Sequence, residues 1–178
     1  MELHGSREIA APRAAVWAAL NDAETLKACI PGCQELTGTP EDGFEAVVTQ
    51  KVGPVKATFR GKVELSDVVE GVSYRIAGEG SGGVAGFARG AADVRLEDLP
   101  DGATKLSFDV DAKVGGKLAQ LGSRIIDGFA KGMADKFFDA LRTRLEGPAE
   151  PETPPEAPGD GAEPEGAAKK GWLSRLRR

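Results

Sequence analysis

The stretch from residue 114 to residue 145, VGGKLAQLGSRIIDGFAKGMADKFFDALRTRL, decides the fold of this chain. Its apolar residues recur every three or four positions, which is typical of a helix with one buried face. Glycines at its start and the pair Gly147–Pro148 at its end mark its limits. The sequence therefore predicts one long C-terminal helix over residues 114–145, with an apolar stripe made of Leu118, Leu121, Ile125, Phe129, Met133, Phe137, Leu141 and Leu145.

Three glycines, Gly122, Gly128 and Gly132, fall inside this predicted helix. Each costs about 1 kcal/mol relative to alanine in a helix interior. Close packing of the helix on a sheet is one explanation for them. The other is that the missing side chains leave room for a ligand between helix and sheet, and the pattern alone leaves both open.

The chain before this helix is dominated by alternating patterns. Residues 55–66 are the clearest case, because apolar residues occupy every second position and mostly charged or hydroxyl residues occupy the others. Such a strand has one dry face and one wet face. Further strands are predicted over residues 2–9, 33–39, 44–52, 72–76, 86–96 and 104–114, and two short helices over 12–20 and 23–30.

This order of elements indicates how the chain folds. A run of antiparallel strands with short turns and one dry face must be covered, and the long helix is the only large apolar surface available. We therefore predict an α+β domain over residues 1–146 in which a curved antiparallel sheet wraps the C-terminal helix. The two short helices that follow the first strand would close one end.

The residues give little support for an enzyme. His4 is the single histidine and falls on the polar side of the first strand, so no nucleophile and base can be paired around it. Cys29 and Cys33 are too few for a metal site, and we expect two ordinary buried or half-buried thiols. Catalytic residues and metal ligands are therefore not predicted.

Two further patterns are weak. Residues 78–83 match G-x-G-x-x-G, but a strand and not a helix is expected to follow, so we predict a glycine-rich hairpin loop. A basic patch on two adjacent strands lacks interleaved aromatic residues, which argues against nucleic-acid binding; it consists of Lys51, Lys56, Arg60 and Lys62.

The C-terminal part changes composition twice. Residues 147–168 carry six acidic and no basic residues and are rich in Pro, Glu, Ala and Gly, so we expect a disordered linker. Residues 169–178, KKGWLSRLRR, carry five basic and no acidic residues, with Trp and Leu on one side of a helix. We expect this tail to dock reversibly on anionic lipid through Lys169, Lys170, Trp172, Leu173, Arg175, Leu176, Arg177 and Arg178. A solubilising tail or a segment that docks on a protein is the alternative.

Four segments in this order, LKACIPGCQ, KVGPVKATFRGKVEL, GSGGVAGFARGAADVRL and DVDAKVGGKLAQLGSRII, resemble the family of the carbon monoxide dehydrogenase CoxG subunit. The Pro-Gly pair at 31–32, the VGPV turn at 52–55 and the VGG at 114–116 are the most specific parts. That family belongs to the START-like, helix-grip superfamily of ligand-binding proteins. The resemblance covers about residues 1–146 and implies the helix-grip (START-like) fold, with a hydrophobic cavity between helix and sheet.

The resemblance also implies a function. Members accompany molybdenum-containing carbon monoxide dehydrogenases and related hydroxylases, and the family is associated with membrane attachment and with respiratory quinone, such as menaquinone. The expected cofactor is thus none that is covalently bound, with quinone as the cargo. The expected cavity lining is Trp17, Ile30, Phe44, Val48, Phe59, Val63, Phe87, Phe108, Val110, Leu118, Leu121, Gly122, Ile125, Phe129 and Met133.

The expected protein is a non-enzymatic carrier that moves quinone between membrane and enzyme. No apolar run approaches the about 20 residues of a spanning helix, and the N-terminus lacks a secretory-signal pattern. We therefore expect a cytoplasmic protein, peripheral on the inner face of the cell membrane. The alternatives are a ligand-free factor that recruits or matures the hydroxylase, and a START-like cyclase or hydrolase.

Overall fold

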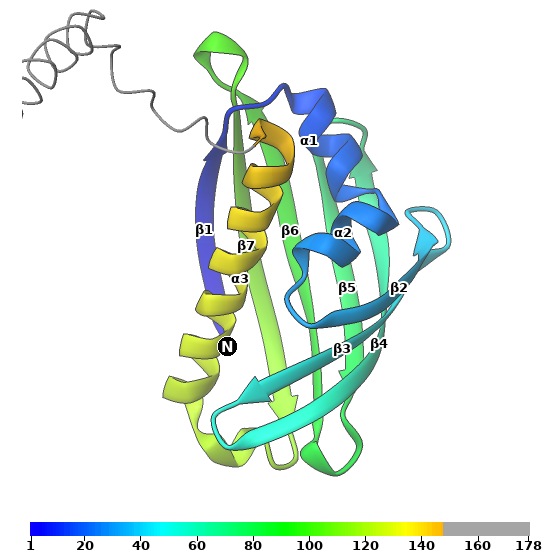
Figure 1. Cartoon of the computed structure of the whole chain (residues 1–178), viewed down its shortest axis with the longest axis vertical. Coiled ribbons are helices and arrows are strands. Elements are labelled where there is room, and N and C mark those ends of the chain that lie inside the picture. The colour runs from blue at the N-terminus through cyan, green and yellow to red at the C-terminus, as the bar shows by residue number, and fades with distance from the viewer. Residues whose placement is uncertain (148–178) are drawn as a thin grey trace, which may run out of the picture. The chain divides into compact units, whose positions relative to one another are not determined.

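The computed structural model describes residues 1–147, which form one compact unit. A seven-stranded antiparallel sheet with the order β1-β7-β6-β5-β4-β3-β2 curves around a long helix (Figure 1). The predicted fold class is confirmed. The strands are β1 (Glu2–Ile9), β2 (Cys33–Thr39), β3 (Gly43–Val52), β4 (Val55–Val69), β5 (Ser73–Ser81), β6 (Phe87–Asp98) and β7 (Thr104–Gly115), and the helices are α1 (Arg13–Leu20), α2 (Ala23–Cys29) and α3 (Ser123–Glu146). Three short 3-10 turns are η1 (Gly83–Ala85), η2 (Pro100–Gly102) and η3 (Ala119–Leu121).

The start of the long helix was predicted wrongly. Strand β7 continues to Gly115, and α3 begins only at Ser123. The backbone of Gly116 has φ +71° and that of Gly122 has φ +87°, which a helix does not tolerate. Leu118 and Leu121 keep the helical spacing across this connection, so the apolar pattern alone conceals the break. Gly122 therefore precedes the helix and does not lie inside it.

Glycine at positive φ also explains two of the turns that the sequence marked. Gly32 has φ +72°, and a Cβ added there would lie 2.2 Å from the backbone oxygen of Thr49. The amide of Thr49 in turn donates to the Gly32 carbonyl at 2.9 Å, which ties the turn after α2 to β3. The side chain of Gln50, a polar residue on the apolar side of β3, donates to the carbonyl of Pro31.

The inner face of the sheet carries the apolar residues and the outer face the charged ones. The core lies where α1, α2 and the C-terminal turns of α3 cover the inner face. Its best-buried members come from β1, β6, β7, α1 and α3, and they are Ile9, Val16, Leu96, Leu106 and Leu141. Thr104 is fully buried beside them, and its hydroxyl donates to the carbonyl of Ala11 at 2.7 Å.

Candidate functional site: an apolar cavity on the inner face of the sheet

Two adjoining hollows lie on the inner face of the sheet. The inner hollow has a volume of about 280 Å³, and its lining is apolar apart from one tyrosine: Leu20, Leu26, Ile30, Leu36, Phe44, Ala46, Val63, Leu65, Tyr74, Ile76, Val94, Leu106, Phe137 and Phe138. The outer hollow has about 370 Å³. The two share Phe44, Ala46, Val63 and Ile76, so they form one continuous apolar site.

The floor of the outer hollow is made of small residues. Gly78 of β5 and Gly90 of β6 are paired in the sheet, and each lies close to a neighbouring strand. A Cβ at Gly78 would lie 2.7 Å from the backbone oxygen of Lys62, and one at Gly90 would lie 2.5 Å from that of Asp111. Only glycine permits this approach, which bends the sheet. The same absence of side chains leaves the hollow open.

Tyr74 places one polar group in the inner hollow. Its ring is 7% exposed and meets Trp17 edge to face at 5.5 Å between ring centroids. Burial raises the pKa of the Tyr74 hydroxyl above its ordinary value, so the group stays neutral and can donate. Within residues 1–147 it has no hydrogen-bond partner, yet no buried polar side-chain atom there is fully enclosed without one. The hydroxyl is therefore reachable from the cavity that Tyr74 lines.

Arg7 is a charged residue that sequence reasoning missed on the inner face. It pairs with Leu106 in the β1–β7 register, and its guanidinium lies 5.7 Å from the Phe108 ring centroid and 5.5 Å from that of Phe138. Its Nη2 donates to Asp135 of α3 at 2.5 Å. The two aromatic rings and the carboxylate hold the arginine, and β1 is thereby fastened to α3. The alternation in β1 was the signal for its position.

The sheet supplies most of the predicted residues that do line the site. Phe44 and Val63 lie in both hollows, Ile30 lies in the inner one, and the outer one contains Val48, Phe59 and Val110. Trp17 and Phe108 belong to the core, where Phe108 stacks on Phe138 at 5.1 Å. Whether any of these side chains contacts a ligand stays a prediction. Leu26, Leu36, Leu65, Ile76 and Val94 were not predicted and line the inner hollow.

Phe87 was placed wrongly. It shares its face of β6 with Arg89, which points to the outer side, and it is 46% exposed. The period of two along β6 was the signal, because Ala88 and Ala92, and not Phe87, follow the inner phase.

The expected contribution of the long helix is also corrected. The helix-side residues expected in the lining were Leu118, Leu121, Gly122, Ile125, Phe129 and Met133, and none of them borders either hollow. Leu118 and Leu121 lie in the connection before α3, since the helix begins later than predicted. Ile125 is 43% exposed, and the helix residues that do line the inner hollow are Phe137 and Phe138.

The two glycines that remain inside α3 are not explained by close packing. A Cβ added to Gly128 or Gly132 would meet nothing within 4 Å. Gly128 is exposed and Gly132 is half-buried. The first half of α3 is therefore intrinsically weak and only loosely covered, because its buried residues, Phe138 and Leu141, both lie in the second half.

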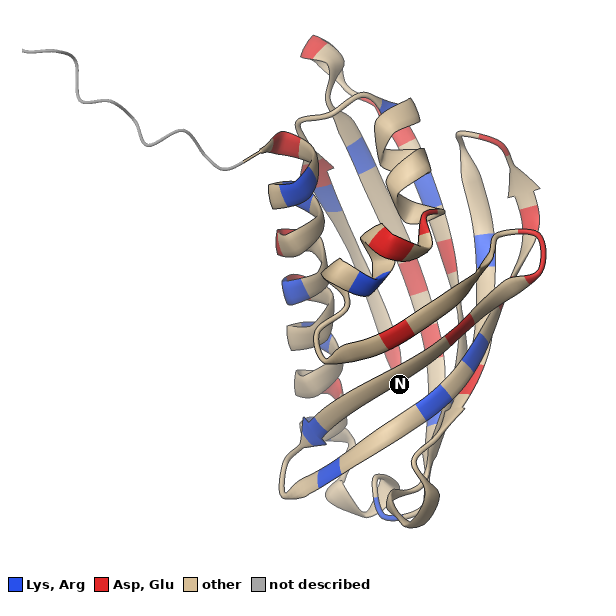
Figure 2. Ribbon diagram, turned by 45° about the vertical axis from the view of Figure 1, so that its right-hand side comes forward, with Lys and Arg blue, Asp and Glu red and all other residues tan. Residues whose placement is uncertain are grey.

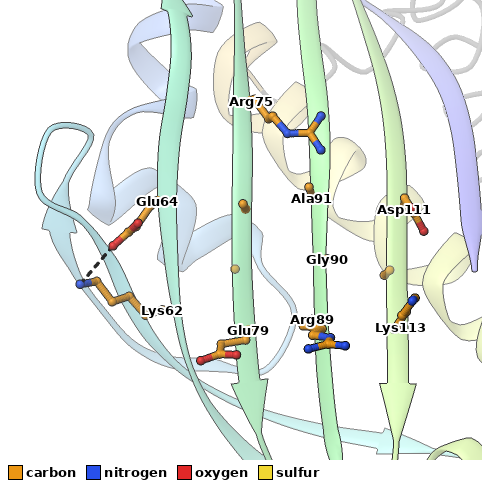
Figure 3. Close-up of a pocket in the computed structure, with 12 residues that line it drawn as sticks. Lys62, Glu64, Arg75, Glu79, Arg89, Gly90, Ala91, Asp111 and Lys113 are labelled. Atoms are coloured by element: carbon orange, nitrogen blue, oxygen red, sulfur yellow. Dashed lines mark ion pairs between the residues drawn. The ribbon is translucent and has the colours of Figure 1, made fainter.

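A larger hollow of about 600 Å³ lies on the outer face across β4–β7, and Figure 3 shows the charged side chains around it. Lys62 pairs with Glu64 at 3.4 Å, and Arg75 pairs with Asp93 at 2.7 Å. Such a mixed, wet surface does not suit an apolar ligand. The apolar site on the inner face is the better candidate despite its smaller volume.

The remaining candidate groups have simple roles. Cys29 is buried and Cys33 half-buried, both are free, and burial raises the pKa of both thiols, so the expectation of ordinary thiols is confirmed. His4 lies on the outer face, 2.7 Å from Asp109. The predicted hairpin loop after β5 is confirmed, since β6 follows it. In residues 1–147, no group of three His, Cys, Asp or Glu side chains is arranged to hold a metal ion.

None of the helices in residues 1–147 combines the length and apolar composition needed to cross a membrane. The predicted linker (147–168, apart from Gly147) and the predicted membrane-docking tail (169–178) lie outside the described residues.

Comparison with known proteins agrees with this geometry. The family model of the carbon monoxide dehydrogenase CoxG subunit matches residues 5–146. A conserved protein from Geobacillus kaustophilus is 29% identical with a TM-score of 0.77, over 82% of this chain and 95% of that one. A START superfamily protein from Mycobacterium smegmatis is 16% identical with a TM-score of 0.62, over 82% and 97%. The ZhuI aromatase/cyclase from a Streptomyces species is 14% identical with a TM-score of 0.60, over 82% and 93%. A search of the curated proteins finds no match.

The curved sheet, the long C-terminal helix and the apolar site between them define a helix-grip protein of the START-like superfamily. Within that superfamily, the chain belongs to the family of the carbon monoxide dehydrogenase CoxG subunit.

Proposed function

We propose that this protein is a non-catalytic carrier of a lipid-soluble molecule, with respiratory quinone, such as menaquinone, as its cargo. The observation that supports this most is the continuous apolar site on the inner face, with hollows of about 280 and 370 Å³. An isoprenoid chain needs such a lining, since a buried charge would require a partner. Tyr74 adds one neutral donor, which suits a carbonyl oxygen at the head of the cargo.

The partner follows from the family. The CoxG name points to a carbon monoxide dehydrogenase, and we propose that the protein serves a molybdenum-containing enzyme of this kind or a related hydroxylase. In this proposal the basic tail, residues 169–178, holds the protein on the inner face of the cell membrane. The domain would load from the bilayer and release to the enzyme.

Organic extraction and mass spectrometry of the full chain, purified from its own host, test the cargo. We expect quinone close to one molecule per chain. Uptake is tested separately by titrating menaquinone into a Trp172→Phe variant, in which Trp17 remains as the fluorescent reporter beside Tyr74. An empty protein that also takes up no quinone would favour a ligand-free recruitment or maturation factor.

Deletion of residues 169–178 tests the tail. We expect weaker co-sedimentation with anionic liposomes, because each basic residue near such a surface contributes about 1 kcal/mol. Unchanged co-sedimentation would reject the tail as a membrane-docking segment. A Ser174→Ala variant, which keeps every basic and apolar residue of the tail, is the control.

A further inference from the structure

We propose that one end of the folded domain is itself a docking surface for an anionic lipid bilayer, and that the apolar site opens toward it. This basic end consists of the β3–β4, β5–β6 and β7–α3 connections, each taken with three residues of the flanking elements: residues 50–57, 79–89 and 113–125. Its purpose rests on the proposed carrier function. Its charge and its exposed apolar residues belong to the domain alone and do not involve the tail.

The charges of the domain are separated along the strands. The basic end carries one acidic residue, Glu79, and six basic ones, which are Lys51, Lys56, Arg89, Lys113, Lys117 and Arg124. All six are exposed, and none forms an ion pair within residues 1–147. The opposite connections, residues 37–45, 67–75 and 96–106, carry eight acidic residues and two basic ones. In Figure 2 the lower turns show blue and the upper turns red.

Large apolar side chains stand exposed among these basic residues. Val84, on η1, is 86% exposed, and Phe87 and Ile125 are 46% and 43% exposed. The hydrophobic effect disfavours such exposure in water, and it is reversed when the side chains enter the interfacial layer of a bilayer. Val68 and Val69 are also exposed, but they lie at the other end, between Asp67 and Glu70.

The three connections touch one another and so present one surface. The amide of Leu118, before α3, donates to the carbonyl of Ala85 in η1 at 3.0 Å. Gly53, in the β3–β4 turn, lies against Ile125, since a Cβ there would be 3.6 Å from its Cγ2. Val84 and Ile125 therefore belong to neighbouring parts of the same end.

The apolar site extends toward this end. Along β5, Tyr74 lines the inner hollow, Ile76 lines both hollows, and Gly78 and Gly80 line the outer one, just before the strand ends at Ser81. Strand β6 shows the same order in reverse, from Ala88 in the outer hollow to Val94 in the inner one. A ligand that leaves the outer hollow at this end thus meets the basic surface.

A bilayer fits this surface better than an acidic protein does. Basic side chains around exposed apolar ones match a layer that is anionic at its surface and apolar below. An acidic protein surface would pair with the lysines and arginines, but it offers no apolar layer to receive Val84. A ligand with an apolar chain also resides in the bilayer, so docking there would bring the opening to its source.

Hydrogen–deuterium exchange of the full chain, with quinone-free vesicles of anionic or neutral lipid, tests the proposal directly. We expect anionic vesicles to slow exchange severalfold in residues 79–89 and 113–125, and to leave residues 37–45 and 96–106 unchanged. Slowing confined to the tail overturns the proposal. So does slowing at the basic end by an acidic partner protein, the host's carbon monoxide dehydrogenase, but not by vesicles.

Charge-reversal variants give a second measurement. The variant Lys56→Glu, Lys117→Glu, Arg124→Glu is expected to lower affinity for anionic vesicles about a hundredfold, at about fivefold for each basic residue. The control Lys27→Glu, Lys131→Glu, Lys136→Glu changes the net charge equally on other exposed positions and should lose far less. Equal losses in both overturn the proposal. Because these vesicles contain no quinone, failure here is distinct from failure to bind quinone.

Discussion

The two parts of the inner face differ in how their apolar residues are covered. Beneath α1, α2 and the second half of α3, Ile9, Leu106 and Leu141 are at most 1% exposed. Toward the basic end, Val48, Phe59 and Val110 are only half-buried, around glycine and alanine. Both parts have the same alternating pattern. A filled core and an open cavity therefore differ in the size of the residues opposite them, which the alternation does not report.

Truncation in the covered part should have the largest effect. Leu141→Ala is expected to lower the free energy of unfolding by about 2–5 kcal/mol, because it leaves a cavity in a fully buried cluster. Urea unfolding measures this. Ile125→Ala, in the same helix but 43% exposed, should cost under about 1 kcal/mol. Equal losses at the two positions would mean that the two parts do not differ.

Much of this contrast could be predicted from the sequence. Every strand and helix was placed in the right order, since period-two alternation and glycine turns are local signals. The start of α3 was missed because Leu118 and Leu121 continue the helical spacing across a connection that Gly116 and Gly122 break.

The site was only partly predictable. The sheet positions Phe44, Val48 and Phe59 follow from alternation. Arg7 and Tyr74 were missed, because polar residues on an apolar face acquire their roles only from tertiary neighbours, namely Asp135 for Arg7 and the inner hollow for Tyr74.

Filling the open part should separate ligand binding from stability. Ala92→Leu adds a large side chain to the outer hollow and is expected to reduce quinone uptake at least tenfold, while the free energy of unfolding changes by about 1 kcal/mol or less. Fluorescence titration and urea unfolding measure the two effects. Ala91→Leu, its neighbour on the outer face, is the control. If Ala91→Leu blocks uptake as strongly, the inner face is not the binding site.

Removal of the one polar group of the inner hollow should have a smaller effect. Tyr74→Phe deletes a hydrogen bond to a quinone carbonyl, and such a bond contributes about 0.5–1.5 kcal/mol, so affinity should fall about twofold to tenfold. Stability should change little, since the hydroxyl has no protein partner within residues 1–147. Titration with a purely hydrocarbon chain supplies the contrast, because its affinity should not fall. An unchanged quinone affinity would remove Tyr74 from the site.

The smallest expected effect is a gain, and it concerns the loosely covered half of α3. Gly132→Ala should raise the free energy of unfolding by up to about 1 kcal/mol, because alanine favours a helix and its Cβ meets nothing within 4 Å. Thermal unfolding would show a rise in Tm of about 2–4 °C. Gly122→Ala is the matched control: its Cβ also has open space, but φ is +87°, so it should destabilise the fold. If Gly132→Ala also destabilises the domain, the space beside the first half of α3 is occupied and the two parts are covered alike.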